Sequence, residues 1–196
     1  MGLSPPAFDP APVIDRLAAL ARADGLWHPR DCPAGTELFA LGDPSSQFWV
    51  LERGLVKLGY LTASGEDWIK SFIVDQGLFT GSGDLSPDGT NRYGATCLEP
   101  CRVAALPLAW LGERIAGSPE LQGDFARFAA WLQARKQRRE EALLCASAEQ
   151  RYRDLLAHDG ALAARLRQAD IARYIGITPI ALSRIRKRLG LSGAAG

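Results

Sequence analysis

The chain has 196 residues, 47% of them hydrophobic and 23% charged, and its 23 Lys and Arg nearly balance its 22 Asp and Glu. This length is enough to bury a sizeable core, and this composition excludes an intrinsically disordered chain. We expect neither a membrane span nor a secretory signal, because no apolar run approaches about 18 residues and the start MGLSPPAFDP lacks a cationic and an apolar part.

The first predicted element is an amphipathic helix over about 10–22, with Asp9 as its N-cap and Pro10 as its first residue. From about residue 35 the pattern changes to short apolar or alternating runs that glycines separate at intervals of about 8–12 residues. Such runs are typical of an antiparallel sandwich or barrel. The predicted strands cover 36–40, 48–51, 55–61, 68–74 and 103–106.

Helical patterns return after the last strand. A short helix is predicted over 107–115, and Ser118 is the expected N-cap of a long helix that runs to about Cys145. Ser147 opens a capping box, which predicts another helix to about His158.

The segment 168–187 meets three separate requirements of a helix-turn-helix. Ala172 supplies a small residue where the two helices cross, and Gly176 supplies a turn residue that tolerates positive φ. Thr178 and Pro179 suit the N-cap and first position of the second helix. The third requirement is an apolar register that buries one face of each helix, and it is met by Ile171, Ile175, Ile177, Leu182 and Ile185.

The same part of the chain is strongly basic. Between residues 161 and 196, seven cationic side chains stand against Asp170 alone. They are Arg165, Arg167, Arg173, Arg184, Arg186, Lys187 and Arg188. A solvated basic tail would also show this excess, and an ordinary helical corner would also contain a glycine turn. A corner inside a core, however, has no need of cations on its outer face, so we predict DNA binding.

Cysteine and histidine content argues against an enzyme. Four cysteines in a chain of this length indicate reduced thiols in the cytoplasm, and Cys97 and Cys101 lack the further ligands of a closed metal site. An enzyme of the cupin type would need two or three histidines inside its barrel, but His28 and His158 lie outside the predicted strands. We therefore expect no metal and no catalytic residues.

Glycine-punctuated strands, a long helix and a C-terminal helix-turn-helix together resemble the cyclic-AMP receptor/fumarate-nitrate regulator (Crp/Fnr) family of bacterial transcription factors. The likeness covers about residues 30–190 and is carried by SAEQRYRDLL at 147–156 and ARYIGITPIALSRIRKRL at 172–189. It implies an α+β fold in which an antiparallel β-roll, a jelly roll like those that bind cyclic nucleotides, precedes a long dimerisation helix. The helix-turn-helix domain would be winged-helix-like, with little or no wing. The expected domains are 1–117, 118–146 and 147–196.

The resemblance implies a dimeric, sequence-specific regulator of transcription in the bacterial cytoplasm. Its partners would be double-stranded DNA with an inverted repeat, a second copy of the chain and RNA polymerase. Its effector would be an unknown small molecule, or it would act without one. The alternative is a cyclic-nucleotide-binding sensor or interaction module that does not bind DNA.

The second helix of the helix-turn-helix carries the expected DNA contacts. Arg184 can pair with both acceptors of a guanine, whereas Ser183 and Lys187 are better placed for phosphates. Ile180 would either contact a thymine methyl group or cover the crossing of the two helices. The complete predicted set is Thr178, Pro179, Ile180, Ser183, Arg184, Lys187 and Arg188.

The expected effector pocket departs from the family. Members that bind cyclic nucleotide use a Gly-Glu pair for the ribose and a later arginine for the phosphate. Here Ser82 replaces the glutamate, and Asn91 takes the position of the arginine with Arg92 beside it. A neutral serine cannot replace that carboxylate, so we expect no cyclic AMP in the family manner and no cofactor. The pocket residues would be Gly81, Ser82, Gly83, Asn91 and Arg92.

An apolar seam on the long helix is the predicted dimer contact. Arg135 and Arg139 follow this seam where a coiled coil would place apolar residues, so we expect a contact that opens in the second half of the helix. The seam consists of Leu121, Phe125, Phe128 and Leu132.

Overall fold

The computed structural model describes residues 8–62, 65–82 and 88–191. Its centre is a roll of eight strands, which form two four-stranded sheets with the orders β1-β8-β3-β6 and β2-β7-β4-β5. All paired strands are antiparallel, as predicted. The strands are β1 (Arg30–Cys32), β2 (Glu37–Phe39), β3 (Gln47–Arg53), β4 (Leu55–Leu61), β5 (Asp67–Val74), β6 (Gly77–Thr80), β7 (Gly94–Cys97) and β8 (Cys101–Pro107).

The sequence analysis missed three of these strands, β1, β6 and β7, which have three or four residues each. Strands this short rarely show an alternating pattern, although the equally short β2 was predicted within the run 36–40. The five predicted strands are present, with shifts of a few residues at their ends.

The interior of the roll is filled by aromatic side chains. Phe39 lies against Trp49, Phe79 and Tyr93 at ring-centroid distances of 6.3, 6.5 and 6.1 Å, and Trp49 stacks on Phe79 at 6.1 Å. All four residues are buried. Rings of this size supply much of the apolar area that stabilises the roll.

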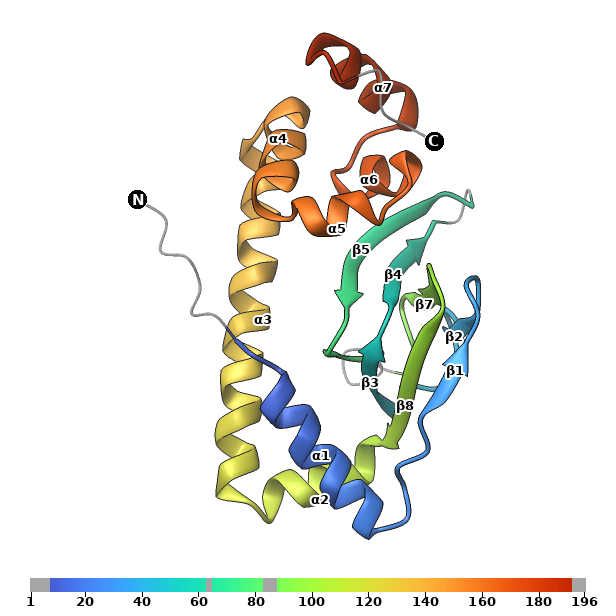
Figure 1. Cartoon of the computed structure of the whole chain (residues 1–196), viewed down its shortest axis with the longest axis vertical. Helices are drawn as coiled ribbons and strands as arrows, with labels where there is room; N and C mark the ends of the chain where they lie inside the picture. Colours follow the sequence, from blue (N-terminus) through green and yellow to red (C-terminus); the bar gives the residue numbers. More distant parts are fainter. Residues whose placement is uncertain (1–7, 63–64, 83–87, 192–196) are drawn as a thin grey trace.

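Three helices flank the roll (Figure 1). α1 (Ala11–Ala23) and α2 (Leu108–Ala116) lie near the lower end of α3 (Pro119–Cys145), which runs beside the roll up to the C-terminal helices. Ser118 caps α3 as predicted, and its hydroxyl accepts a hydrogen bond from the Leu121 N–H at 3.3 Å. The cap of α1 differs from the prediction, because Pro10 is the N-cap residue and the Asp9 carboxylate accepts from the Ala11 N–H.

Four shorter helices form the C-terminal part at the upper end of α3 (Figure 1). This part packs onto β5 of the roll, where Phe72 meets Tyr174 of the third of these helices at 5.0 Å between ring centroids. Leu55, Ile69 and Phe72 of the roll share one apolar cluster with the C-terminal helices. The helices are α4 (Ala148–His158), α5 (Gly160–Ala164), α6 (Gln168–Tyr174) and α7 (Pro179–Arg188).

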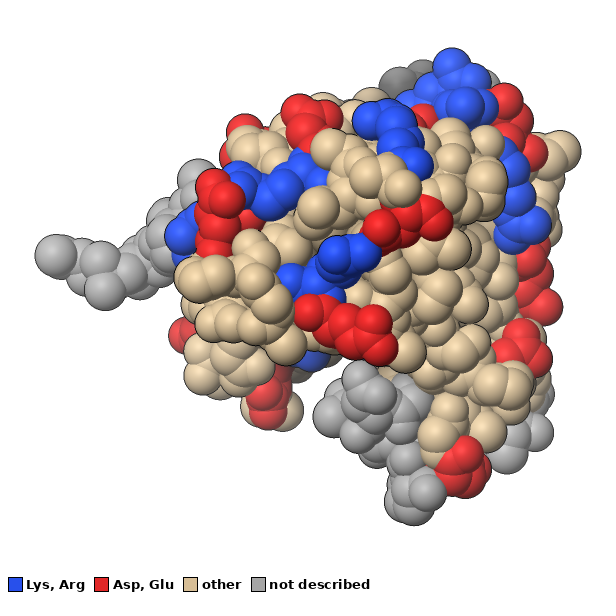
Figure 2. Space-filling view, turned by 90° about the horizontal axis from the view of Figure 1, so that it is seen from below, with Lys and Arg blue, Asp and Glu red and all other residues tan. Residues whose placement is uncertain are grey.

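The opposite end of the molecule has a mixed charge. Figure 2, seen from that end, shows Lys and Arg beside Asp and Glu. Ion pairs such as Arg16–Glu120 and Arg114–Asp24 join the helices there. A surface of alternating sign is unsuited to a polyanion, so a nucleic-acid interface has to be sought elsewhere. Among the described residues, no helix is both long enough and apolar enough to cross a bilayer.

Candidate nucleic-acid interface

α6 and α7 form the predicted helix-turn-helix. Gly176 adopts a φ of 75° in the turn, and the Ile177 N–H donates to the carbonyl of Ala172 at 3.0 Å. Ala172 is fully buried where the helices cross. The positive φ of Gly176 disfavours any residue with a side chain, and a Cβ at this position would lie only 3.1 Å from Leu143 of α3. Both the backbone conformation and the limited space therefore favour glycine. These roles of Ala172 and Gly176 agree with the sequence prediction.

The apolar register also closes a small core. Ile171, Ile175, Leu182 and Ile185 are buried, and they share a cluster with Tyr152 of α4. The polar face of α7 is thereby turned away from the protein. α7 is also the outermost helix of this part, with α6 between it and the roll (Figure 1).

Thr178 begins α7 as its N-cap. Its hydroxyl oxygen accepts a hydrogen bond from the Ala181 N–H at 3.2 Å, and Pro179 occupies the first turn, where a missing N–H costs nothing.

Replacing Thr178 with alanine should therefore lower the free energy of unfolding by about 1 kcal/mol. Thr178→Ser keeps the accepting oxygen and should stay close to wild type. Urea unfolding, followed by circular dichroism, measures the free energy of unfolding of both variants. Equal values for Thr178→Ala and Thr178→Ser would show that the cap contributes nothing to stability.

The seven residues predicted to contact DNA all lie on the exposed face of α7 or at its start. Ile180 is 68% exposed, so it does not cover the crossing of the two helices. Of the two predicted roles, only the contact with a thymine methyl group is left. Arg184 and Lys187 make no ion pair or hydrogen bond with any residue that the structure describes. They are therefore the two cations of α7 with their charge fully available to a ligand.

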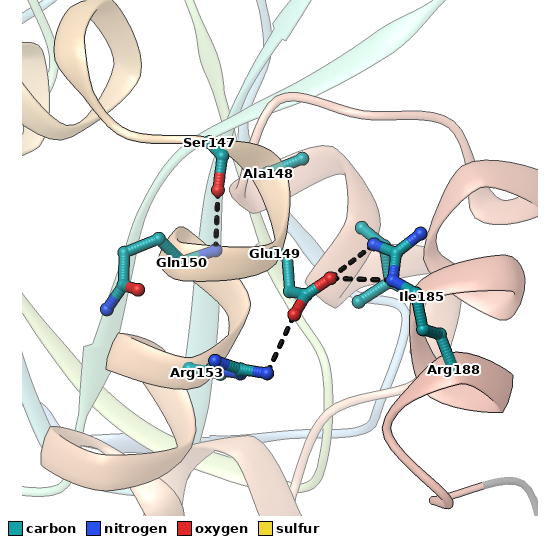
Figure 3. Close-up of a pocket in the computed structure, with 7 residues that line it drawn as sticks. All are labelled: Ser147, Ala148, Glu149, Gln150, Arg153, Ile185 and Arg188. Atoms are coloured by element: carbon teal, nitrogen blue, oxygen red, sulfur yellow. Dashed lines mark hydrogen bonds and ion pairs between the residues drawn. The ribbon is translucent and has the colours of Figure 1, made fainter.

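Arg188 differs from these two because it is held within the protein. Its Nε donates to Glu149 Oε2 at 2.7 Å, and the other carboxylate oxygen of Glu149 lies 2.7 Å from Arg153 Nη2. Figure 3 shows Glu149 between the two guanidinium groups in a hollow of about 460 Å³ between α4 and α7. This pairing fixes α7 to α4 and leaves Arg188 a weaker candidate for a phosphate contact than Lys187.

Two more basic residues of the C-terminal part pair with acids of the roll. Arg165 binds Asp75 at 2.7 Å and Glu99 at 2.5 Å, and Arg173 lies 3.8 Å from Asp67. Burial alone would raise the pKa of Asp75, but the Gly54 N–H and the Arg165 guanidinium outweigh it and lower that pKa. Arg165 and Arg173 thus help to hold the C-terminal part on the roll and are not free for DNA.

The sequence carried no signal for these ion pairs. Asp75 and Glu99 precede Arg165 by 90 and 66 residues, so only the fold brings them together. Some of the C-terminal cations from which the sequence analysis predicted DNA binding are therefore neutralised by acidic residues of the protein itself.

The predicted effector-pocket residues bind one another. The Ser82 N–H donates to Asn91 Oδ1 at 3.1 Å, and the Arg92 N–H donates to Ser82 Oγ at 2.7 Å. A Cβ on Gly81 would collide with the Asn91 side chain, which is only 3% exposed, whereas Arg92 is exposed. Gly83 lies outside the described residues. The Ser82 hydroxyl oxygen and the Asn91 amide oxygen are thus engaged within the protein, whereas only the backbone of Arg92 takes part.

The predicted dimer seam lies mostly against the chain's own core. Leu121 is fully buried among residues of α1 and the roll, so its assignment to a dimer contact is corrected to a core position. Phe125 and Phe128 are half-buried and meet Phe48 and Phe8 at 5.7 and 5.4 Å.

Leu132 is also half-buried, and its contact with a second subunit stays a prediction together with those of Phe125 and Phe128. The mostly exposed face of α3 is a neighbouring stripe that contains Ala126, Ala130, Gln133, Gln137 and Leu144.

The cysteines are free thiols. Cys32, Cys97 and Cys101 are buried in the roll, and Cys145 is exposed. Burial raises the pKa of Cys97 to about 12, with Cys101 as a further cause, so its thiol stays protonated. Within the described ranges, no group of three His, Cys, Asp or Glu residues is arranged to hold a metal ion.

Comparison with known proteins shows which family and which solved structures this chain resembles. Residues 29–115 match the family described as cyclic nucleotide-binding domain. No curated protein sequence gives a significant match. The c-di-GMP-responsive global regulator CLP of Xanthomonas campestris is 18% identical, with a TM-score of 0.71 and coverage of 95% of this chain and 96% of that chain.

Two other solved structures are equally alike in fold. FixK2 of Bradyrhizobium japonicum is 20% identical, with a TM-score of 0.70 and 87% of each chain covered. A protein of Eubacterium rectale assigned to the Crp/Fnr family of transcriptional regulators is 12% identical, with a TM-score of 0.70 and coverage of 93% of this chain and 88% of that chain. At these identities the likeness shows a shared fold.

Proposed function

We propose that the chain is a dimeric, sequence-specific DNA-binding regulator of transcription. The proposal is supported by the match of residues 29–115 to the cyclic nucleotide-binding domain family and by a fold shared with Crp/Fnr regulators. The protein would bind an inverted repeat in double-stranded DNA through α7 of each subunit. The proposal assigns no enzymatic activity to the chain.

One observation supports this function more than any other. The exposed face of α7 carries two cations without partners in the described chain, Arg184 and Lys187, and the helix begins with a capped, positively polarised N-terminus at Thr178. A helix of a helix-turn-helix lies in the major groove with the residues near its N-terminus toward the base edges. Ser183 and Arg184 are exposed in the middle of α7, and Lys187 lies nearer its C-terminal end.

Duplex binding as a function of salt tests the proposal. The full-length protein should bind a fluorescent duplex, and the logarithm of its affinity should fall linearly with the logarithm of the salt concentration as phosphate counterions are released. The double variant Arg184→Gln with Lys187→Gln should show a shallower slope. Binding that is absent at low salt would favour the alternative of an interaction module that does not bind DNA. Binding that is unaffected by this variant would show that DNA contacts a surface other than α7.

The closed hydrogen bonds around Asn91 lead to a prediction about the effector. Cyclic AMP should produce no heat beyond dilution in isothermal titration calorimetry at millimolar nucleotide, because Ser82 offers no carboxylate to the ribose and Asn91 no positive charge to the phosphate. Micromolar binding would contradict the assignment of these residues to an internal structural role.

A further inference from the structure

The carboxylate of Glu149 lies between two guanidinium groups in the hollow between α4 and α7 (Figure 3). Its Oε2 atom accepts hydrogen bonds from both Nε and Nη2 of Arg188, the first at 2.7 Å. Its Oε1 atom lies 2.7 Å from Nη2 of Arg153. Two positive charges thus share one negative charge, and no other acidic residue of the described chain lines this hollow.

Glu149 is held at this place by the start of α4. Ser147 caps the helix, because its hydroxyl oxygen accepts a hydrogen bond from the Gln150 N–H at 3.1 Å. Glu149 follows in the first turn, where the helix dipole favours a negative charge, and its side chain is half-buried. The carboxylate therefore acts as a built-in counter-ion for the two arginines.

The two arginines, in contrast, reach solvent. The side chains of Arg153 and Arg188 are 55% and 61% exposed. Arg188 directly follows Lys187 in the last turn of α7, the helix proposed to meet DNA. Ion pairs at this exposure stabilise a fold only weakly, so the main effect of Glu149 is on the charge that this surface offers to a ligand.

We propose that Glu149 limits the affinity of this surface for a phosphate-bearing polyanion by holding Arg153 and Arg188 in ion pairs. The inference rests on the proposed function in that the polyanion is duplex DNA. Contacts with phosphates carry no sequence information and supply nearly all of the affinity for non-specific DNA. By weakening such contacts, Glu149 shortens the time spent on DNA that lacks the base pairs read by Arg184.

Glu149→Gln tests this role, because it removes the charge and keeps the size of the side chain. Its affinity for a duplex of random sequence should rise roughly three- to tenfold per subunit at about 0.1 M salt, and its salt slope should steepen by about one per subunit. Fluorescence anisotropy over a range of salt concentrations measures both. Circular dichroism should show the helix content of wild type.

Asp154→Asn is the matched control. It removes the same charge from the same helix, but Asp154 accepts only from the neutral amide of Gln150, at 2.8 Å, and no cation of the described residues lies within ion-pair distance of it. Asp154→Asn should bind the duplex like wild type. An equal gain in affinity for Asp154→Asn and Glu149→Gln would show that net charge alone is responsible, and would overturn the proposal.

A second set of variants tests whether the effect passes through the two arginines. In a protein that already carries Arg153→Gln and Arg188→Gln, the further change Glu149→Gln should leave duplex affinity and salt slope unchanged. The proposal is also overturned if Glu149→Gln alone changes neither quantity. A lower operator affinity in Glu149→Gln, with a weaker base preference, would show instead that Glu149 positions α7.

Heparin separates a failure of this inference from a failure of the proposed function, because it is a polyanion without bases. Glu149→Gln should elute from immobilised heparin at a higher salt concentration than wild type. If this shift occurs and neither protein binds a duplex, the proposed function fails and the role of Glu149 stands. If wild type binds a duplex and heparin retains the two proteins equally, the role of Glu149 fails and the proposed function stands.

Discussion

Arg184→Ala is expected to weaken binding to the preferred operator by about 1–3 kcal/mol, roughly 5- to 150-fold, and to relax the preference at one base pair in each half-site. The reason is its position on the outer face of α7, exposed and without a partner in the described residues. Arginine can bind O6 and N7 of guanine together, and alanine can bind neither. Fluorescence anisotropy with the operator and its single-base variants measures both effects.

Lys187→Ala is the matched control for this prediction. It removes another exposed cation one turn further along α7, and it should weaken binding to all sequences alike while reducing the salt slope by about one for each subunit bound. Arg188→Ala should have a smaller effect than Lys187→Ala, because Glu149 already neutralises Arg188. If Arg184→Ala changes only the salt slope and leaves the base preference intact, Arg184 contacts phosphate and the assignment of the base-reading residue is wrong.

If the subunits meet through α3, two glutamates on its exposed stripe, beside the half-buried residues of the predicted seam, are expected to abolish the dimer. The stripe repeats at the four–three spacing of a coiled-coil seam through Ala126, Ala130, Gln133 and Gln137, and it ends near Leu144, which is 77% exposed. Ala126→Glu with Ala130→Glu would place four like charges between two such helices. The variant should have the mass of a monomer in light scattering, and its operator affinity should fall by about 10²–10⁴ because two linked contacts become one.

The double variant Ala157→Glu with Ala164→Glu is the control for added charge. Both residues are exposed and belong to the C-terminal helices α4 and α5, outside the stripe of α3, so the variant should remain dimeric. An unchanged mass of the α3 variant, with helix content equal to wild type, would show that the subunits associate through another surface.

The helix-turn-helix was predictable because its requirements are local. A small residue, a glycine and an apolar register fall within one short segment, and each has the predicted role in α6 and α7. The roll was predictable for a similar reason, since glycines and short apolar runs alternate along one stretch of the chain. The three strands that were missed, β1, β6 and β7, have only three or four residues each.

The parts that the sequence analysis missed depend on distant residues. The role of Arg165 depends on Asp75 and Glu99, and that of Arg188 on Glu149, which precedes it by 39 residues. The apolar face of α3 looked like a dimer seam, but α1 and the roll cover its first residue, Leu121. Helical spacing shows which residues share a face, and it does not show whether that face meets the same chain or another.

Selection of binding sites from a random duplex pool with the wild-type protein tests the central claim most directly. A dimer that reads DNA through one α7 per subunit should enrich an inverted repeat whose half-sites lie about 34–36 Å apart, one turn of the duplex. Sequences recovered without any enriched motif, or with a single unrepeated half-site, would contradict the account.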